Sequence, residues 1–229
     1  MNDNRLGGLA LILGAISGIL TLTFHPGGGG GAHRVTPAQF EVLVAVIIGV
    51  HALALCGLPI SFIGALALTR RIDSPLRLAL FGLTIYGFGL VATMAAATMS
   101  GLVTPDILRK MTAHDSATDQ WHTLMFYTHA INQAFARVHV IAFSVAISLW
   151  SLAILKRPGL PRMLAVYGIV AAVFVVIAIV SGTLNMELHG FRITTLIQAL
   201  WFLFAGVFLW RSGTAEGGFA APRAFAASA

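Results

Sequence analysis

The chain has 229 residues, of which 58% are hydrophobic and only 10% are charged. Soluble domains carry about 25% charged residues, so this chain lacks the polar side chains that would cover a water-facing surface, and we expect lipid to surround most of it. The formal net charge of +6 comes without a Lys/Arg-rich run or a nucleic-acid motif, so nucleic acid is excluded as an expected partner. The expected partners are the lipid bilayer and other membrane subunits.

The first apolar run, residues 6–24, predicts a membrane-spanning helix. A signal peptide is the competing interpretation, but the run is longer than the usual apolar region of such a peptide, and the three residues after it offer no small-residue cleavage site. Gly14 and Gly18, four positions apart, are spaced for close packing against another helix. Residues 25–37 contain five consecutive glycines and predict a flexible loop.

The later apolar runs predict five more spans, at about 38–69, 76–102, 122–155, 161–184 and 191–210. The fold class is therefore an all-α, polytopic bundle of six transmembrane helices, a single domain over residues 1–211 followed by a disordered cytoplasmic tail, 212–229. The second and fourth helices are longer than a bilayer needs and should tilt or project from it. Pro59 should kink the second helix. Residues 103–121, the most polar stretch, predict a loop with room for a short surface helix.

Arginine and lysine set the predicted orientation, because basic residues gather on cytoplasmic loops. With six spans, nine basic residues share the side of the two termini: Arg5, Arg70, Arg71, Arg77, Lys156, Arg157, Arg162, Arg211 and Arg223. Four lie on the other side: Arg34, Arg109, Lys110 and Arg192. This asymmetry predicts a multi-pass protein of a bacterial-type inner (plasma) membrane with both termini in the cytoplasm.

Two histidines fall inside predicted spans. His51 lies 19 residues before Arg70 and His139 lies 17 residues before Lys156, so both should sit roughly 26–28 Å from the cytoplasmic side. Two imidazoles level with one another on separate helices are suited to bind haem b iron axially, an arrangement similar to that of membrane b-type cytochromes. The alternative is that each histidine only joins helices through a hydrogen bond.

Arg137 precedes His139 by two residues and should be buried at the same depth, where a charge is costly and indicates a functional site. It is expected to meet an anion such as a haem propionate, or else to reach the outer interface. His129, Gln133 and Arg137 form one polar stripe at helical spacing, with Asn132 on a neighbouring face. The stripe should face the bundle interior, either lining a pocket with Glu41 at its mouth or forming a structural network.

Six of the eight histidines fall on or near the predicted outer face: His25, His33, His114, His122, His129 and His189. The simplest interpretation is that polar residues belong in loops. The alternative is a divalent transition-metal site, for which His122, Glu187 and His189 are the candidate ligands. No tight signature such as HExxH is present, so this site depends on distant residues meeting in space.

Four classes of function remain open. The first, which we adopt as the working hypothesis, is a redox or metal/haem-binding membrane component, with haem b or a divalent transition metal as the cofactor. The others are a small-molecule transporter or sensor, a membrane enzyme acting on a lipid-soluble substrate, and a structural or assembly subunit. An enzyme would use His129 or His139 with Glu41 or Glu187 as acid and base. The sequence names no substrate.

Overall fold

The computed structural model describes residues 2–26, 36–72, 77–113, 118–156 and 161–216. Every regular element in these ranges is helical. In chain order they are α1 (Asp3–Phe24), α2 (Pro37–Ile72), α3 (Leu78–Thr98), the π-helix η1 (Met99–Val103), α4 (Thr104–Ala113), α5 (Thr118–Leu155), α6 (Arg162–Val180) and α7 (Leu188–Glu216). Six helices of the described part are long and apolar enough to cross a membrane, with α3, η1 and most of α4 forming one of them.

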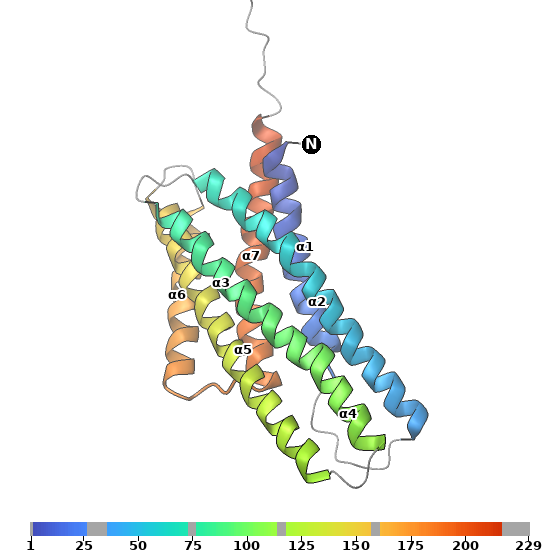
Figure 1. Ribbon diagram of the computed structural model, residues 1–229. Coiled ribbons are helices and arrows are strands. Elements are labelled where there is room, and N and C mark those ends of the chain that lie inside the picture. The colour runs from blue at the N-terminus through green and yellow to red at the C-terminus, as the bar shows by residue number, and fades with distance from the viewer. Residues whose placement is uncertain (1, 27–35, 73–76, 114–117, 157–160, 217–229) are drawn as a thin grey trace, which may run out of the picture.

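The helices run up and down, so that α1 begins and α7 ends at the same end of the bundle (Figure 1). We call this the terminal end and the other the opposite end. The first and last helices pack side by side, and α1 also packs along α2. A second layer is formed by α3 against α5 and by α5 against α6. This closed arrangement gives each long helix at least one close neighbour.

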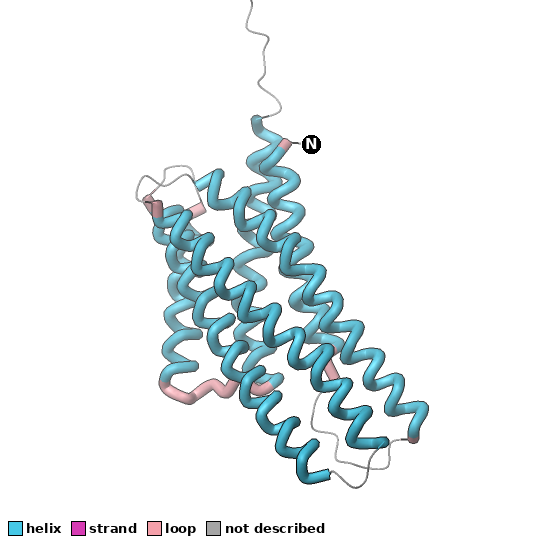
Figure 2. The backbone as a smooth tube through the Cα atoms, viewed as in Figure 1, coloured by secondary structure: helices cyan, strands magenta, loops and turns pink. Residues whose placement is uncertain are grey.

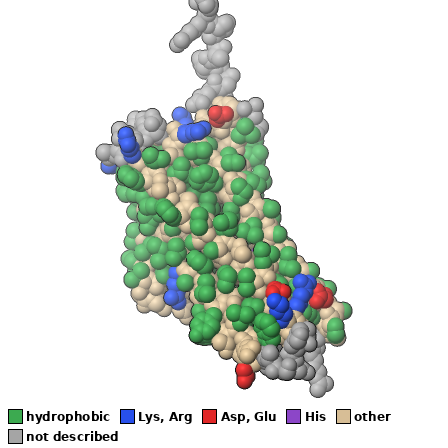
Figure 3. Space-filling view, in the orientation of Figure 1, with side chains coloured by type: hydrophobic (Ala, Val, Ile, Leu, Met, Phe, Trp, Pro, Cys, Tyr) green, Lys and Arg blue, Asp and Glu red, His purple; other side chains and the backbone are tan. Residues whose placement is uncertain are grey.

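The outward faces of the helices are apolar. Phe88, Met163 and Val170 are 70%, 87% and 62% exposed. Figure 3 shows hydrophobic side chains over the middle of one face, with most of the charged side chains on that face gathered toward its two ends. A middle band of this kind is what a bilayer solvates, so the six-span prediction is confirmed as far as length, number and apolar character go.

The core lies mainly between α3, α5 and α7. Trp150 stacks on Trp201 with ring centroids 5.8 Å apart, and Tyr86 packs against Phe143 at 4.4 Å. Small residues bring the helices close together. A Cβ on Gly14 would lie 2.7 Å from the Cβ of Ser61 in α2, so the predicted packing role of Gly14 is confirmed. Gly18 has only one side-chain atom as near as 4.0 Å.

Helix boundaries differ from the prediction by a few residues at several ends, and two of these differences change the predicted loop and tail. The predicted loop 103–121 is helical through Ala113, because the third span continues through η1 into α4. The predicted disordered tail begins too early, since α7 continues to Glu216; residues 217–229 lie outside the described part, as does most of the predicted glycine loop. Helix α2 runs on through Pro59.

The two over-long helices are confirmed, with 36 residues in α2 and 38 in α5. At the opposite end, the first turns of α2 and α5 extend with α4 beyond the turn that joins α6 to α7 (Figure 2). An ion pair joins two of these helices, with the Nη2 of Arg109 2.9 Å from the Oε2 of Glu41. Lys110 lies 5.9 Å from the ring centroid of Trp121 in α5. The bundle therefore carries a projecting three-helix end.

Candidate functional site

His51 is buried, with 6% of its surface exposed. Its Nδ1 lies 2.6 Å from the carbonyl oxygen of Ile47, one turn earlier in α2. A carbonyl only accepts, so Nδ1 carries the proton and Nε2 keeps its lone pair. A Cβ on Gly101 in η1 would come 2.7 Å from the Cγ of His51, so glycine lets the η1 backbone rest against this side chain.

His139, in α5, is equally buried at 5% exposed. Its Nδ1 lies 2.6 Å from the Oγ1 of Thr93 in α3, and that hydroxyl donates to the carbonyl of Gly89 at 2.8 Å. Because the hydroxyl proton is used on Gly89, Thr93 accepts from His139, and Nε2 again keeps the lone pair. The ring packs against Phe143 at 4.1 Å and Phe191 at 5.6 Å between centroids.

The two rings contact different places on the third span. His51 meets Gly101 and His139 meets Thr93, which are eight residues, or roughly 12 Å, apart along a helix. The sequence estimate placed the two imidazoles at one level. That estimate measured each helix from its own cytoplasmic end, and it took no account of how the helices cross.

His25 is the neighbour of His51 that sequence reasoning missed. It follows α1 directly, and its ring stands edge-on to that of His51, with centroids 5.0 Å apart and planes at 73°. Its Nδ1 lies 3.0 Å from the carbonyl oxygen of Pro26, so Nδ1 donates here too. Burial lowers the pKa of His25, the bond to Pro26 acts in the opposite direction, and the charge of Arg192 lowers the pKa further.

Arg192 holds the end of α1 in place. Its Nε donates to the carbonyl of Leu22 at 2.9 Å and its Nη2 to the carbonyl of His25 at 3.0 Å. A cation at a helix C-terminus satisfies carbonyls that have no intrahelical partner and matches the helix dipole. The signal in the sequence was the position of His25 just after the first apolar run and of Arg192 at the start of the last.

The three imidazoles share one hydrogen-bonding state. In each, Nδ1 donates to an oxygen of the protein, and none of the three Nε2 atoms has a hydrogen-bond partner among the residues that the structure describes. Histidines that bind metals almost always donate their other ring N–H to a carbonyl, carboxylate or water, which fixes the tautomer. Chemically, the arrangement can offer neutral nitrogen lone pairs to a metal.

Arg137 and the polar stripe lie elsewhere. Arg137 and His129 are exposed, while Asn132 and Gln133 are partly exposed. The expectation that the stripe faces the bundle interior is wrong, because the buried face of this part of α5 runs through other positions. Those positions are Thr128, Ala136, His139 and Val140. Arg137 fits the alternative of a cation that reaches the interface.

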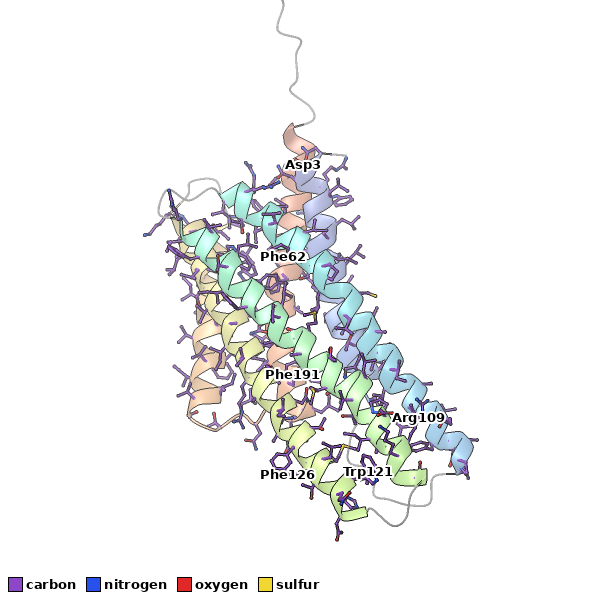
Figure 4. The ribbon with its side chains drawn as sticks, in the orientation of Figure 1. Asp3, Phe62, Arg109, Trp121, Phe126 and Phe191 are labelled. Carbon is purple, nitrogen blue, oxygen red and sulfur yellow. The ribbon has the colours of Figure 1, made fainter. Side chains whose placement is uncertain are left out.

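The predicted divalent-metal set is not brought together. His122, Glu187 and His189 are all exposed, and within the described ranges no three His, Cys, Asp or Glu side chains are placed to hold an ion. Glu41 pairs with Arg109 on the projecting end instead of closing a pocket over the stripe. Figure 4 shows Arg109 and Trp121 at this opposite end, away from Phe62.

Comparisons of the chain with protein-family models, with curated proteins and with solved structures gave no match.

Proposed function

We propose that this protein is a multi-pass membrane component with a redox role that binds a transition-metal centre, haem iron or a single metal ion, through imidazole nitrogens near the opposite end of the bundle. One observation carries the proposal. Two buried histidines, His51 and His139, have their Nδ1 protons committed to oxygen acceptors, and their Nε2 lone pairs have no partner in the described part of the chain.

A purely structural role accounts less well for this state. A histidine that only joined helices would gain by using both ring nitrogens as hydrogen-bonding groups. His51 does not join helices at all through its hydrogen bond, since Ile47 lies in the same helix. A missing ligand on Nε2 accounts for both residues.

The proposal includes an orientation. We place the terminal end in the cytoplasm of a bacterial-type cell, because the topology predicted from the sequence assigns nine basic residues to that side and four to the other. The opposite end, with His25 and His51, then faces the outside of the inner membrane. Cysteine-accessibility labelling of single-cysteine variants at Ser212 and Thr123 in intact cells tests this orientation.

The direct test is an absorption spectrum of the detergent-purified protein, oxidised and then reduced with dithionite, together with elemental analysis of the same sample. Haem and metal ions should both be supplied during expression. A Soret band with α and β bands on reduction, or one metal ion per chain, supports the proposal. A centre held by one or both buried histidines should be lost in His51→Ala, in His139→Ala or in both, while His129→Ala, which changes an exposed histidine on the same helix as His139, should keep it.

A colourless protein without a stoichiometric metal under these conditions overturns the proposal. The two buried histidines would then be packing residues, and the chain would be a structural subunit or a carrier without a metal centre. Loss of the centre in the His129→Ala control alone would also contradict it, because that result would assign the centre to the outer surface of α5.

A further inference from the structure

We propose that the metal centre is a single copper ion in its monovalent state, held between the Nε2 atoms of His25 and His51. The inference rests on the proposed function and chooses among the three imidazoles. His51 and His25 are in ring contact, whereas the rings against His139 belong to Phe143 and Phe191, which offer no ligand atom.

The spacing of the two rings suits one shared ion. Metal–imidazole bonds are about 2.0–2.1 Å long, so two imidazoles bound to one ion have ring centroids roughly 5 Å apart at a tetrahedral angle and roughly 6 Å apart in a linear arrangement. The centroids of His25 and His51 are 5.0 Å apart. The observed spacing matches the tetrahedral angle, so other donors would complete the coordination of the ion.

Contacts with the surrounding protein hold each imidazole in place. The carbonyl of Ile47 and the close backbone of Gly101 position His51. The carbonyl of Pro26 bonds the ring of His25, and Arg192 fixes its backbone. Sites that bind metals depend on such supporting bonds, and η1 is a π-helix, an element found mostly at functional sites.

The charge of the surroundings selects the ion. Both ligands are neutral and the nearest charge is the cation Arg192, so a divalent ion would be poorly compensated in an environment of low dielectric. Imidazole suits copper, and the monovalent ion carries the smaller charge.

The test uses the full chain in detergent, titrated with Cu(I) under ascorbate against a colorimetric Cu(I) chelator. We expect one ion per chain, and a fall in affinity of about 100-fold or more in His25→Ala and in His51→Ala, at the upper end of the losses seen even for supporting residues. His139→Ala and His129→Ala should bind as the wild type does. X-ray absorption of the loaded protein should show two imidazole ligands.

Two further measurements guard against misfolding. His25→Ala removes a ring whose one hydrogen bond within the described ranges is to the next residue, so this variant should fold, and added imidazole should restore its Cu(I) binding. Thermal unfolding of each variant in the same detergent separates lost binding from lost structure. Failure of imidazole to restore binding in folded His25→Ala counts against a direct ligand.

The possible results separate the two proposals. A centre that depends on His51 and His139 but not on His25, or a Soret band, supports the proposed function and overturns this inference. Binding by the wild type that is no tighter than by a His25→Ala/His51→Ala double variant, with no other metal or haem present, overturns both. Dependence on His25 and His51 alone supports both.

Discussion

The regions around His51 and His139 are alike in burial and in tautomer but differ in what surrounds the ring. His139 is enclosed by Phe143 and Phe191, and its hydrogen bond crosses from α5 to α3. His51 is hydrogen-bonded within its own helix and stands against a second imidazole. The difference is that only His51 has another possible metal ligand in ring contact with it. The side chains within reach of its second nitrogen decide the chemistry.

The largest effect is expected at Arg192, which supports the His51 region. Arg192→Met removes two hydrogen bonds from a charged donor to the carbonyls of Leu22 and His25, and should lower the free energy of unfolding by about 1.5–3 kcal/mol. Arg137→Met is the matched control, because Arg137 is exposed, and it should stay within about 0.5 kcal/mol of the wild type. Unfolding in SDS followed by tryptophan fluorescence measures both. Greater sensitivity at Arg137 would restore the interior role that the sequence suggested.

Gly101→Ala tests the His51 region through η1, which packs against the ring of His51. The added Cβ would overlap the side chain of His51, which should destabilise the protein by about 1–3 kcal/mol and weaken Cu(I) binding at least roughly tenfold. Gly49, on the helix of His51, has no atom within 4 Å of a built Cβ, so Gly49→Ala should leave binding unchanged. Wild-type affinity in folded Gly101→Ala would mean that η1 does not position His51.

Thr93→Val tests the His139 region. It removes the acceptor for the Nδ1 proton of His139, and an unpaired buried donor should cost about 1–2 kcal/mol. Thr98→Val is the control, since both threonines donate to a carbonyl four residues earlier at 2.8 Å but only Thr93 also accepts from a histidine. Cu(I) titration should give the wild-type affinity for both variants. Loss of Cu(I) binding in Thr93→Val would make the two regions one site.

Acidification should affect the His25–His51 contact. The pKa of His25 is lowered in the folded protein from its usual value of 6.5, so the unfolded chain takes up a proton on this imidazole first as the pH falls. Above pH 6.5 the imidazole of His25 is neutral in both states, and its full contribution to stability is present. This contribution is lost as the pH falls through the lowered pKa of the folded state. The stability of the wild type should decline more steeply below pH 6.5 than that of His25→Ala. Equal slopes would contradict this account.

The smallest effect is expected at the ion pair of the projecting end, which touches neither region. Glu41→Gln breaks the 2.9 Å contact with Arg109, but both side chains are about half exposed, and water and salt screen exposed ion pairs strongly. Raising the salt concentration should abolish the difference in melting temperature between this variant and the wild type. A difference that persists in high salt would indicate a packing role for Glu41.

The spans could be predicted from the sequence because an apolar run of sufficient length is a local property. The boundary after the third span could not, because Thr104–Ala113 is polar in composition and its helix is supported by packing against η1 and α5. His51 and His139 could be predicted as buried for the same local reason. That Arg137 points out of the bundle could not be predicted, because it depends on which face of α5 meets the other helices.

The contact of His25 with His51 lay beyond the sequence, because it joins two residues on either side of the loop between the first two helices. The support of His25 by Arg192 was harder still to predict, since the two residues are 167 positions apart. Neither relation has a fixed spacing that a motif search would recognise. Only the packing of α1 between α2 and α7 brings the three side chains together.

The bond between Arg192 and the end of α1 also sets an order of events during synthesis. At about 5–20 residues per second, the ribosome reaches Arg192 roughly ten to thirty seconds after His25. During that interval α1 has α2 beside it but not α7, and its last carbonyls lack their donor. The copper ligand His25 is thus fixed in position only when the final helix has entered the membrane. A chain arrested before α7 is made would be inserted in the membrane, but its His25 would lack the support of Arg192.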